Sequence, residues 1–201
     1  LQDHRKGVKA VLKRLQLLGL VLLLAALACA WTDANMVVNG DMAMDWDKNG
    51  LPDYWSITWL FSGGPNKPSM DHNENIDGNA SLRLDVTSLD VANNFAGRVY
   101  QDIPVTSGKT YEISMWVKAN WKTADGQSPA GINISYWLQG TNKQWGNRED
   151  LTDLVDGTFN WREIKATITI PPKTQAIRLA LFAYKGTGTI WIDSIKMVEV
   201  K

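Results

Sequence analysis

The stretch "TYEISMWVKA", from Thr110 to Ala119, alternates between apolar and other side chains. Successive side chains of a β-strand point to opposite faces, so this period of two predicts a strand with one face on a core. The core face would carry Tyr111, Ile113, Met115 and Val117, and the opposite face would carry Glu112, Ser114, Trp116 and Lys118. Strands of this kind belong to antiparallel sheets that are buried on one side, which already excludes a helical fold for this region.

A second stretch, "GINISYWLQG" at 131–140, repeats the pattern, with Asn133, Ser135, Trp137 and Gln139 on its polar face. Gly, Pro, Asn and Asp clusters separate further candidate strands at 80–86, 97–105, 161–170, 176–184 and 188–200, with shorter ones at 36–39, 55–61 and 68–71. Many short strands without a helical period predict an all-β fold, a two-sheet antiparallel β-sandwich of the jelly-roll type. Two long polar connections, 119–130 and 140–160, are expected to be functional loops.

The first thirty residues differ from the rest of the chain. Five basic residues within positions 1–14 precede the apolar run "LQLLGLVLLLAALACA", which is short for a membrane span. This arrangement predicts a secretory signal peptide over 1–30, cleaved after Ala30. The alternatives are a retained anchor, or lipidation of the single cysteine, Cys29, in a loose lipobox. All of these predict export from the cytoplasm, to a secreted or extracellular location.

Residues 31–201 would form one domain. They carry 16 Lys and Arg against 20 Asp and Glu, a net charge of −4, without a basic cluster. That balance argues against nucleic acid or an anionic membrane as the partner. The oligomeric state is left open by the sequence.

The sequence holds few residues suited to catalysis. His72 is the only histidine beyond residue 30, and no nucleophile elbow or phosphate-binding loop is present. Retaining glycosidases need two carboxylates about 5 Å apart, and no strand shows paired acids on one face. We therefore expect a protein that is not an enzyme.

Aromatic residues indicate binding instead. The chain has 10 Trp, all beyond residue 30. An indole ring can stack on the apolar face of a sugar, while amides and carboxylates bind its hydroxyl groups. Trp116 and Trp137 both project from polar strand faces, and Trp145 lies in the loop "NKQWGN". If the two strands share a sheet, that face would bind sugar, with Gln101 as an additional amide. The alternative is that a loop covers Trp116 or Trp137 and forms a second small core there. Trp161 and Trp191 lie on apolar strands and are expected in the core.

The stretch "DWDKNGLPDYW" begins like a calcium-binding loop. Asp45, Asp47, Asn49 and Asp53 occupy positions 1, 3, 5 and 9, but Ser56 stands where a bidentate Glu belongs at position 12. A polar turn held by Gly50 and Pro52 is the alternative to a metal site.

Four segments occur in an order that resembles a known family. They are "VVNGDM", "NGLPDYW", "VYQDIPVTSGKTYEISMWVKA" and "FNWREIKATITIPPKTQAIRLALFAYKGTGTIWIDSIKM". Together they look like the jelly-roll carbohydrate-binding modules of families 4, 9, 16 and 22, which have a galactose-binding-domain-like fold. The resemblance implies non-catalytic binding of a β-linked polysaccharide of the β-glucan, mannan or xylan type.

The resemblance also implies site residues. For sugar it points to Trp55, Gln101, Trp137 and Trp145. For a structural calcium it points to Asp41 and Asp193, although Ala43 stands where the family has a ligating Glu. Acidic residues of 45–53 could join Asp41 and Asp193 in place of that Glu. The alternatives to a carbohydrate-binding module are an extracellular structural or adhesive protein and, least favoured, a jelly-roll glycosidase.

Overall fold

A computed structural model describes residues 34–58, 67–87, 95–123, 131–153 and 156–201. All of the described strands belong to one compact unit, Asn35–Lys201. The expected signal peptide lies outside the described residues. Within the described ranges, no helix has the length and apolarity needed to cross a membrane.

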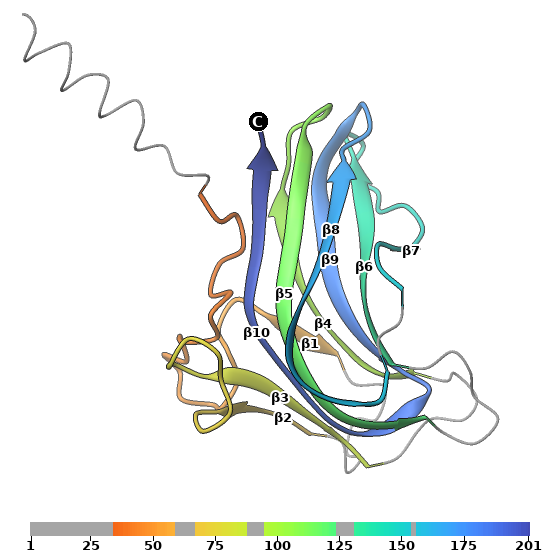
Figure 1. Cartoon of the computed structure of the whole chain (residues 1–201). Coiled ribbons are helices and arrows are strands. Elements are labelled where there is room, and N and C mark those ends of the chain that lie inside the picture. Colours follow the sequence, from red (N-terminus) through yellow and green to blue (C-terminus); the bar gives the residue numbers. More distant parts are fainter. Residues whose placement is uncertain (1–33, 59–66, 88–94, 124–130, 154–155) are drawn as a thin grey trace, which may run out of the picture. The chain divides into compact units, whose positions relative to one another are not determined.

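The described residues form two five-stranded antiparallel sheets (Figure 1). Sheet A has the order β1-β4-β9-β6-β7, and sheet B has the order β2-β3-β10-β5-β8. The strands are β1 (Ser56–Thr58), β2 (Lys67–Asp71), β3 (Ser81–Val86), β4 (Phe95–Pro104), β5 (Thr110–Thr123), β6 (Gly131–Gly140), β7 (Glu149–Asp150), β8 (Thr158–Thr169), β9 (Thr174–Tyr184) and β10 (Gly186–Val200). The predicted all-β sandwich is confirmed.

The core lies between the sheets and results from the period-two pattern of their strands. Sheet B contributes fully buried side chains that include Leu82, Ile113, Met115, Ile190 and Ile192. Sheet A contributes Val99, Ile103, Ile134, Ile177 and Leu179. Burying one such side chain stabilises the fold by roughly 1.5–3 kcal/mol, so two facing apolar layers hold the sheets together. The alternating residues on both sheets are left on the outer faces, where a ligand can reach them.

Two predicted local features differ in the structure. Residues 36–39 do not form a strand but lie mostly in a turn, with the Met36 N–H donating to the Met197 carbonyl of β10 at 2.9 Å. The predicted loop 119–130 begins later than expected, because β5 continues to Thr123 by pairing with β10. Long-range backbone hydrogen bonds decide both cases, and a single strand's pattern does not contain them.

Candidate functional site

The outer face of sheet A carries a pair of aromatic rings around a small residue. Tyr100 of β4 and Trp137 of β6 both pack against Ala180 of β9, which is fully buried. Ala180 is the cross-strand partner of both Tyr100 and Ser135, so small side chains occupy the middle of the sheet here. We call this arrangement the Tyr100–Trp137 trough. The two rings cover Ala180, which is fully buried, while the rings themselves are half-buried.

Two guanidinium groups lie over the rings of the trough. The Arg98 guanidinium lies 5.2 Å from the Tyr100 ring centroid and 5.5 Å from that of Trp137. Its Nε is buried and has no hydrogen-bond partner among the described residues. The Arg178 guanidinium lies 4.5 Å from the Tyr100 centroid and 4.6 Å from that of Trp145. The face therefore combines aromatic surfaces with hydrogen-bond donors.

Arg178 and Arg98 differ in how their charge is balanced. Arg178 donates from Nε and Nη2 to the two carboxylate oxygens of Asp102, at 2.6 and 2.8 Å. These hydrogen bonds raise the pKa of Arg178 above its usual value, against the opposing effect of burial. Arg98 has no such carboxylate among the described residues, and its Nε–H is buried there without a hydrogen-bond partner.

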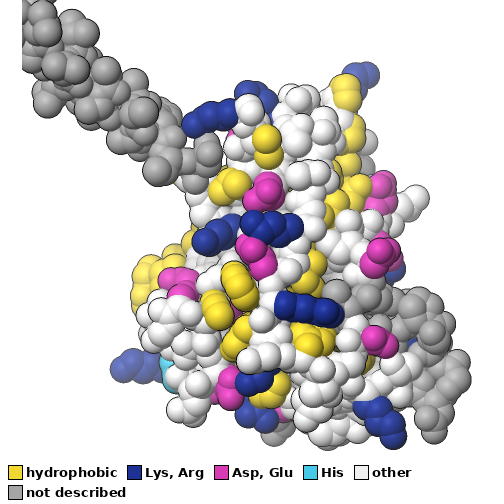
Figure 2. All heavy atoms as spheres, viewed as in Figure 1, with side chains coloured by type: hydrophobic (Ala, Val, Ile, Leu, Met, Phe, Trp, Pro, Cys, Tyr) yellow, Lys and Arg dark blue, Asp and Glu magenta, His cyan; other side chains and the backbone are white. Residues whose placement is uncertain are grey.

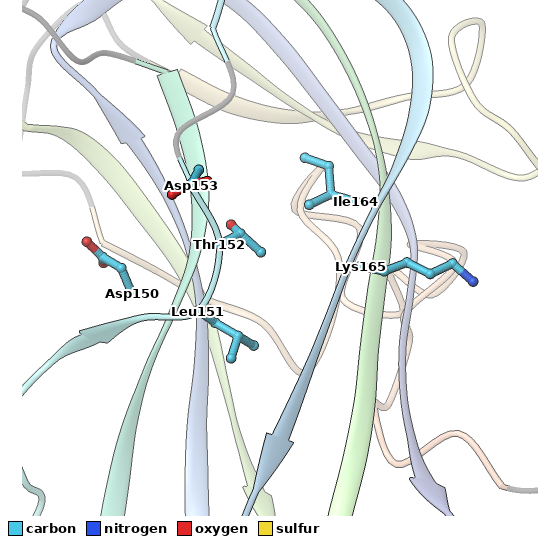
Figure 3. A pocket seen from close by; sticks show the side chains of 6 residues that line it. All are labelled: Asp150, Leu151, Thr152, Asp153, Ile164 and Lys165. Atoms are coloured by element: carbon cyan, nitrogen blue, oxygen red, sulfur yellow. The ribbon is translucent and has the colours of Figure 1, made fainter.

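A shallow hollow adjoins this face at the open edge of the sandwich (Figure 3). Its volume is about 490 Å³, and residues 150–153 line it together with Ile164 and Lys165 of β8. Asp150 connects it to the trough's sheet by accepting a hydrogen bond from the Ser135 hydroxyl at 2.6 Å. The Lys165 side chain points away from Asp150 and Asp153. None of the lining residues is aromatic, so the hollow offers no surface on which a sugar ring could stack.

Two of the predicted sugar-binding residues lie together on this face. Trp137 is the cross-strand partner of Arg178, and Trp145 is held over the same Arg178 by an isolated bridge to Gln139. Trp116, by contrast, belongs to β5 in sheet B. The strands of Trp116 and Trp137 therefore do not share a sheet, as the predicted common sugar-binding face required. The two indoles lie on different sheets.

The structure corrects the expected positions of Trp55 and Gln101. Trp55 is only 8% exposed and belongs to the core, where its Nε1 donates to the Asn39 carbonyl at 3.0 Å. Gln101 faces inward between Val99 and Ile103 and is 7% exposed. Its amide accepts from the Val38 N–H and donates to the Val38 carbonyl, both at 2.9 Å. Both side chains hold the segment before β1 in place, and neither is accessible for stacking or bonding to a sugar here.

Replacing Gln101 with alanine is expected to destabilise the fold without weakening sugar binding. The change removes two part-buried hydrogen bonds to the backbone of Val38, which costs about 1 kcal/mol. Urea unfolding measures the free energy of unfolding, and calorimetry with a bound oligosaccharide measures the affinity of the folded variant. If the free energy of unfolding is unchanged but the affinity for the oligosaccharide falls strongly, Gln101 is a sugar-binding residue after all.

The predicted calcium loop is a turn whose side chains bond to its own backbone. The two carboxylate oxygens of Asp45 accept from the Asn49 and Gly50 N–H groups, both at 3.0 Å. Asp47 accepts from the Asn49 N–H at 3.1 Å, and Asp53 accepts from the Trp46 N–H at 2.7 Å. This geometry supports the alternative of a polar turn. It leaves calcium binding by this segment an untested prediction.

Asp193 of β10, another predicted calcium ligand, is fully buried. The register of β10 shifts between Asp193 and Lys196, and Ser194 there adopts a positive φ of 48°. The Asp193 carboxylate accepts from the N–H groups of Ile76, at 2.9 Å, and Ser194. Burial raises its pKa to about 6, and the charges of Asp77 and Asp41 contribute in the same direction. Among the described residues, no three acidic, His or Cys side chains converge on one metal position.

Residues 57–187 match the family model CBM_4_9, described as a carbohydrate binding domain. The chain belongs to this family of carbohydrate-binding domains. The match spans β1 to the start of β10 and so includes every residue of the Tyr100–Trp137 trough. A comparison with curated protein sequences found no match.

Solved structures of carbohydrate-binding modules share the fold. The CBM22-1 xylan-binding domain of Paenibacillus barcinonensis Xyn10C has a TM-score of 0.58 at 15% identity, covering 86% of this chain and 98% of that one. A CBM4 domain has a TM-score of 0.53 at 20% identity, covering 82% and 99%. The CBM22-1–GH10 modules of Clostridium thermocellum Xyn10B, solved with xylohexaose, have a TM-score of 0.59 at 16% identity, covering 85% and 29%. At these identities the likeness shows the fold.

Three residues of this module's trough were not predicted from the sequence, namely Arg98, Tyr100 and Arg178. A signal for them exists, since Val99, Ile103, Ile177 and Leu179 alternate with them and are buried. In β4 this alternation is interrupted, because the polar residue Gln101 stands at an inward position of the strand. The polar residue is tolerated there because both ends of its amide are hydrogen-bonded.

Proposed function

We propose that the module binds a β-linked polysaccharide of the β-glucan, mannan or xylan type on the outer face of sheet A. The observation that carries the proposal is the Tyr100–Trp137 trough, whose rings flank the buried Ala180. A sugar ring has an apolar C–H face that packs on an indole or phenol ring. The guanidinium groups of Arg98 and Arg178 lie over the same rings and bring N–H donors to this face. Two of the structurally similar proteins are named as xylan-binding domains. Xylan is therefore among the ligands to test.

Isothermal titration calorimetry tests the proposal with xylohexaose, cellohexaose and mannohexaose, beside affinity electrophoresis on the corresponding polysaccharides. We expect at least one of these ligands to bind. A folded protein that binds none of them would overturn the proposal. The module is further proposed to be non-catalytic, and release of reducing sugar from the same polysaccharides would contradict that part.

A structural calcium at Asp193 is also part of the proposal. A buried carboxylate with two other acids near enough to raise its pKa is a site where a hard cation would relieve repulsion. Asp193 and Asp41 would hold the ion, and further oxygen ligands would have to come from the backbone, because no three acidic side chains converge on one position among the described residues. The bound ion would hold β10 and the segment around Ile76 together.

Saturating calcium is therefore expected to raise the melting temperature over that in EDTA, by about 5 °C or more. The reason is mass action, since an ion that binds only the folded state stabilises it. Differential scanning calorimetry of the native protein and of Asp193→Asn measures the effect. The variant should lose the calcium response, and equal melting temperatures of the native protein in EDTA and in calcium would contradict the calcium site.

Export is proposed on the N-terminal sequence alone. The basic residues and apolar run within 1–30 support a cleaved signal or a lipid anchor at Cys29. Mass spectrometry of the expressed protein distinguishes cleavage after Ala30 from a lipidated or uncleaved N-terminus.

A further inference from the structure

Two tryptophans that the sequence led us to expect in the core lie outside it. Trp161 of β8 is half-buried and does not belong to the core cluster. Strand β10 buries Ile190 and Ile192 on its inner side, so Trp191 points to the outer face of sheet B and is half-buried there. The Trp191 Nε1 donates to a carboxylate oxygen of Asp71 at 2.9 Å, which fixes the orientation of the ring. A large aromatic ring is thus held in place on the outer face of sheet B.

A hollow of about 510 Å³ opens beside this ring. Residues 69–74, at the end of β2 and the turn after it, form its wall together with Arg83 and Trp191. We call it the Trp191 hollow. Figure 2 views this side of the molecule, where hydrophobic side chains are interleaved with acidic and basic ones. Its size falls within the range of small-ligand sites, about 300–1,000 Å³, and suits one or two sugar rings.

The charges around the hollow are paired. Arg83 contacts Asp85 at 3.0 Å and Asp71 at 3.5 Å, and Lys118 contacts Glu74 at 2.6 Å. Three acids therefore face two bases, which leaves a local charge of −1. An anionic ligand such as a uronate or a phosphate would be repelled here. A neutral ligand with hydroxyl groups would instead exchange hydrogen bonds with these polar groups.

The two bases also shape the aromatic surface. The Arg83 guanidinium lies 5.6 Å and the Lys118 ammonium 5.4 Å from the centroid of the Trp191 ring. These cation–π contacts hold both basic groups against the indole, so their N–H donors lie beside the aromatic surface. Ser69 and Asn73 add a hydroxyl and an amide to the wall. The hollow therefore combines an oriented aromatic ring with a polar rim.

We propose that the Trp191 hollow is a second saccharide site, which takes neutral sugar rings. The inference rests on the proposed function, because it assigns the same ligand class to a second face. The two sites lie on the outer faces of different sheets, so one module would bind two polysaccharide chains or two segments of one chain.

Calorimetry with xylohexaose, cellohexaose and mannohexaose tests the proposal on four proteins. The native protein should bind two ligand molecules, and the double variant Tyr100→Ala/Trp137→Ala should bind one. Adding Trp191→Ala to the double variant should abolish the remaining binding. Trp116→Ala is the matched control, since Trp116 is a half-buried indole on the same sheet that does not line the hollow. It should leave two sites.

A second measurement avoids dependence on the stability of the Trp191→Ala variant. In ¹H–¹⁵N spectra of the Tyr100→Ala/Trp137→Ala protein, the indole N–H of Trp191 should shift on addition of the oligosaccharide that binds. One site in the native protein and none in the double variant, with no such shift, would overturn the second site and leave the proposed function intact. If the double variant keeps every site and adding Trp191→Ala to it removes one, the result would instead support the Trp191 hollow and remove the trough from the proposed function.

Discussion

We expect the substitution Trp137→Ala to lower the affinity of the outer face of sheet A for its oligosaccharide by about tenfold. The indole forms one side of the Tyr100–Trp137 trough and packs against Ala180. Loss of one stacking surface is worth on the order of 1–2 kcal/mol, which corresponds to that change in the dissociation constant. Calorimetry with the best-binding hexasaccharide measures it.

The folded state should tolerate this substitution. Trp137 lies on the outer face of β6. The core side of that strand is formed by Ile134, Tyr136 and Leu138. Trp116→Ala serves as the control, because it removes an indole of similar exposure from the other sheet. Equal affinity losses from Trp116→Ala and Trp137→Ala would show that sheet A is not where the ligand stacks.

Replacing Gly188 with alanine is expected to cost about 3–5 kcal/mol of folding free energy. Gly188 has a φ of +137°, a region that other residues avoid. A Cβ there would stand 2.0 Å from the Asn120 carbonyl oxygen of the neighbouring strand β5. Strands β5 and β10 are paired along almost their whole length, so neither backbone can move aside cheaply.

Gly108→Ala separates the two causes of this loss. Gly108 also has a positive φ, of +80°, but nothing lies within 4 Å of its added Cβ. It should lose only about 1 kcal/mol, from backbone strain alone. Urea unfolding at equilibrium compares the two variants by linear extrapolation. Similar losses for both would mean that the contact with Asn120 is relieved by a small shift of the strands.

The sequence predicted the architecture and part of the site. Alternation in "TYEISMWVKA" and "GINISYWLQG" identified β5 and β6 and the side chains that share a face within each strand. Trp137 and Trp145, which the sequence singled out on a polar strand face and in a polar turn, lie near each other around Arg178, and their role in binding stays a prediction. The family resemblance is confirmed by the match over residues 57–187.

Alternation within a strand also has a limit, which Trp55 and Gln101 illustrate. A tryptophan beside a turn and a glutamine between two strand residues both looked exposed. Each is buried because its polar atoms find backbone partners far away in the sequence, at Asn39 and Val38. Such partners offset the cost of burying a polar group, and only the folded chain brings them together.

The sequence by itself determined that the chain forms strands, which residues alternate on each strand, and that a layer of aromatic and polar groups would remain outside a two-sheet core. The tertiary structure decided which strands share a sheet. Strands β5 and β6 follow each other in the chain yet enter different sheets, so Trp116 and Trp137 end on opposite layers. The physical reason is that strand neighbours are chosen by hydrogen bonding and packing between distant segments, and the period of two is the same whichever neighbour a strand takes.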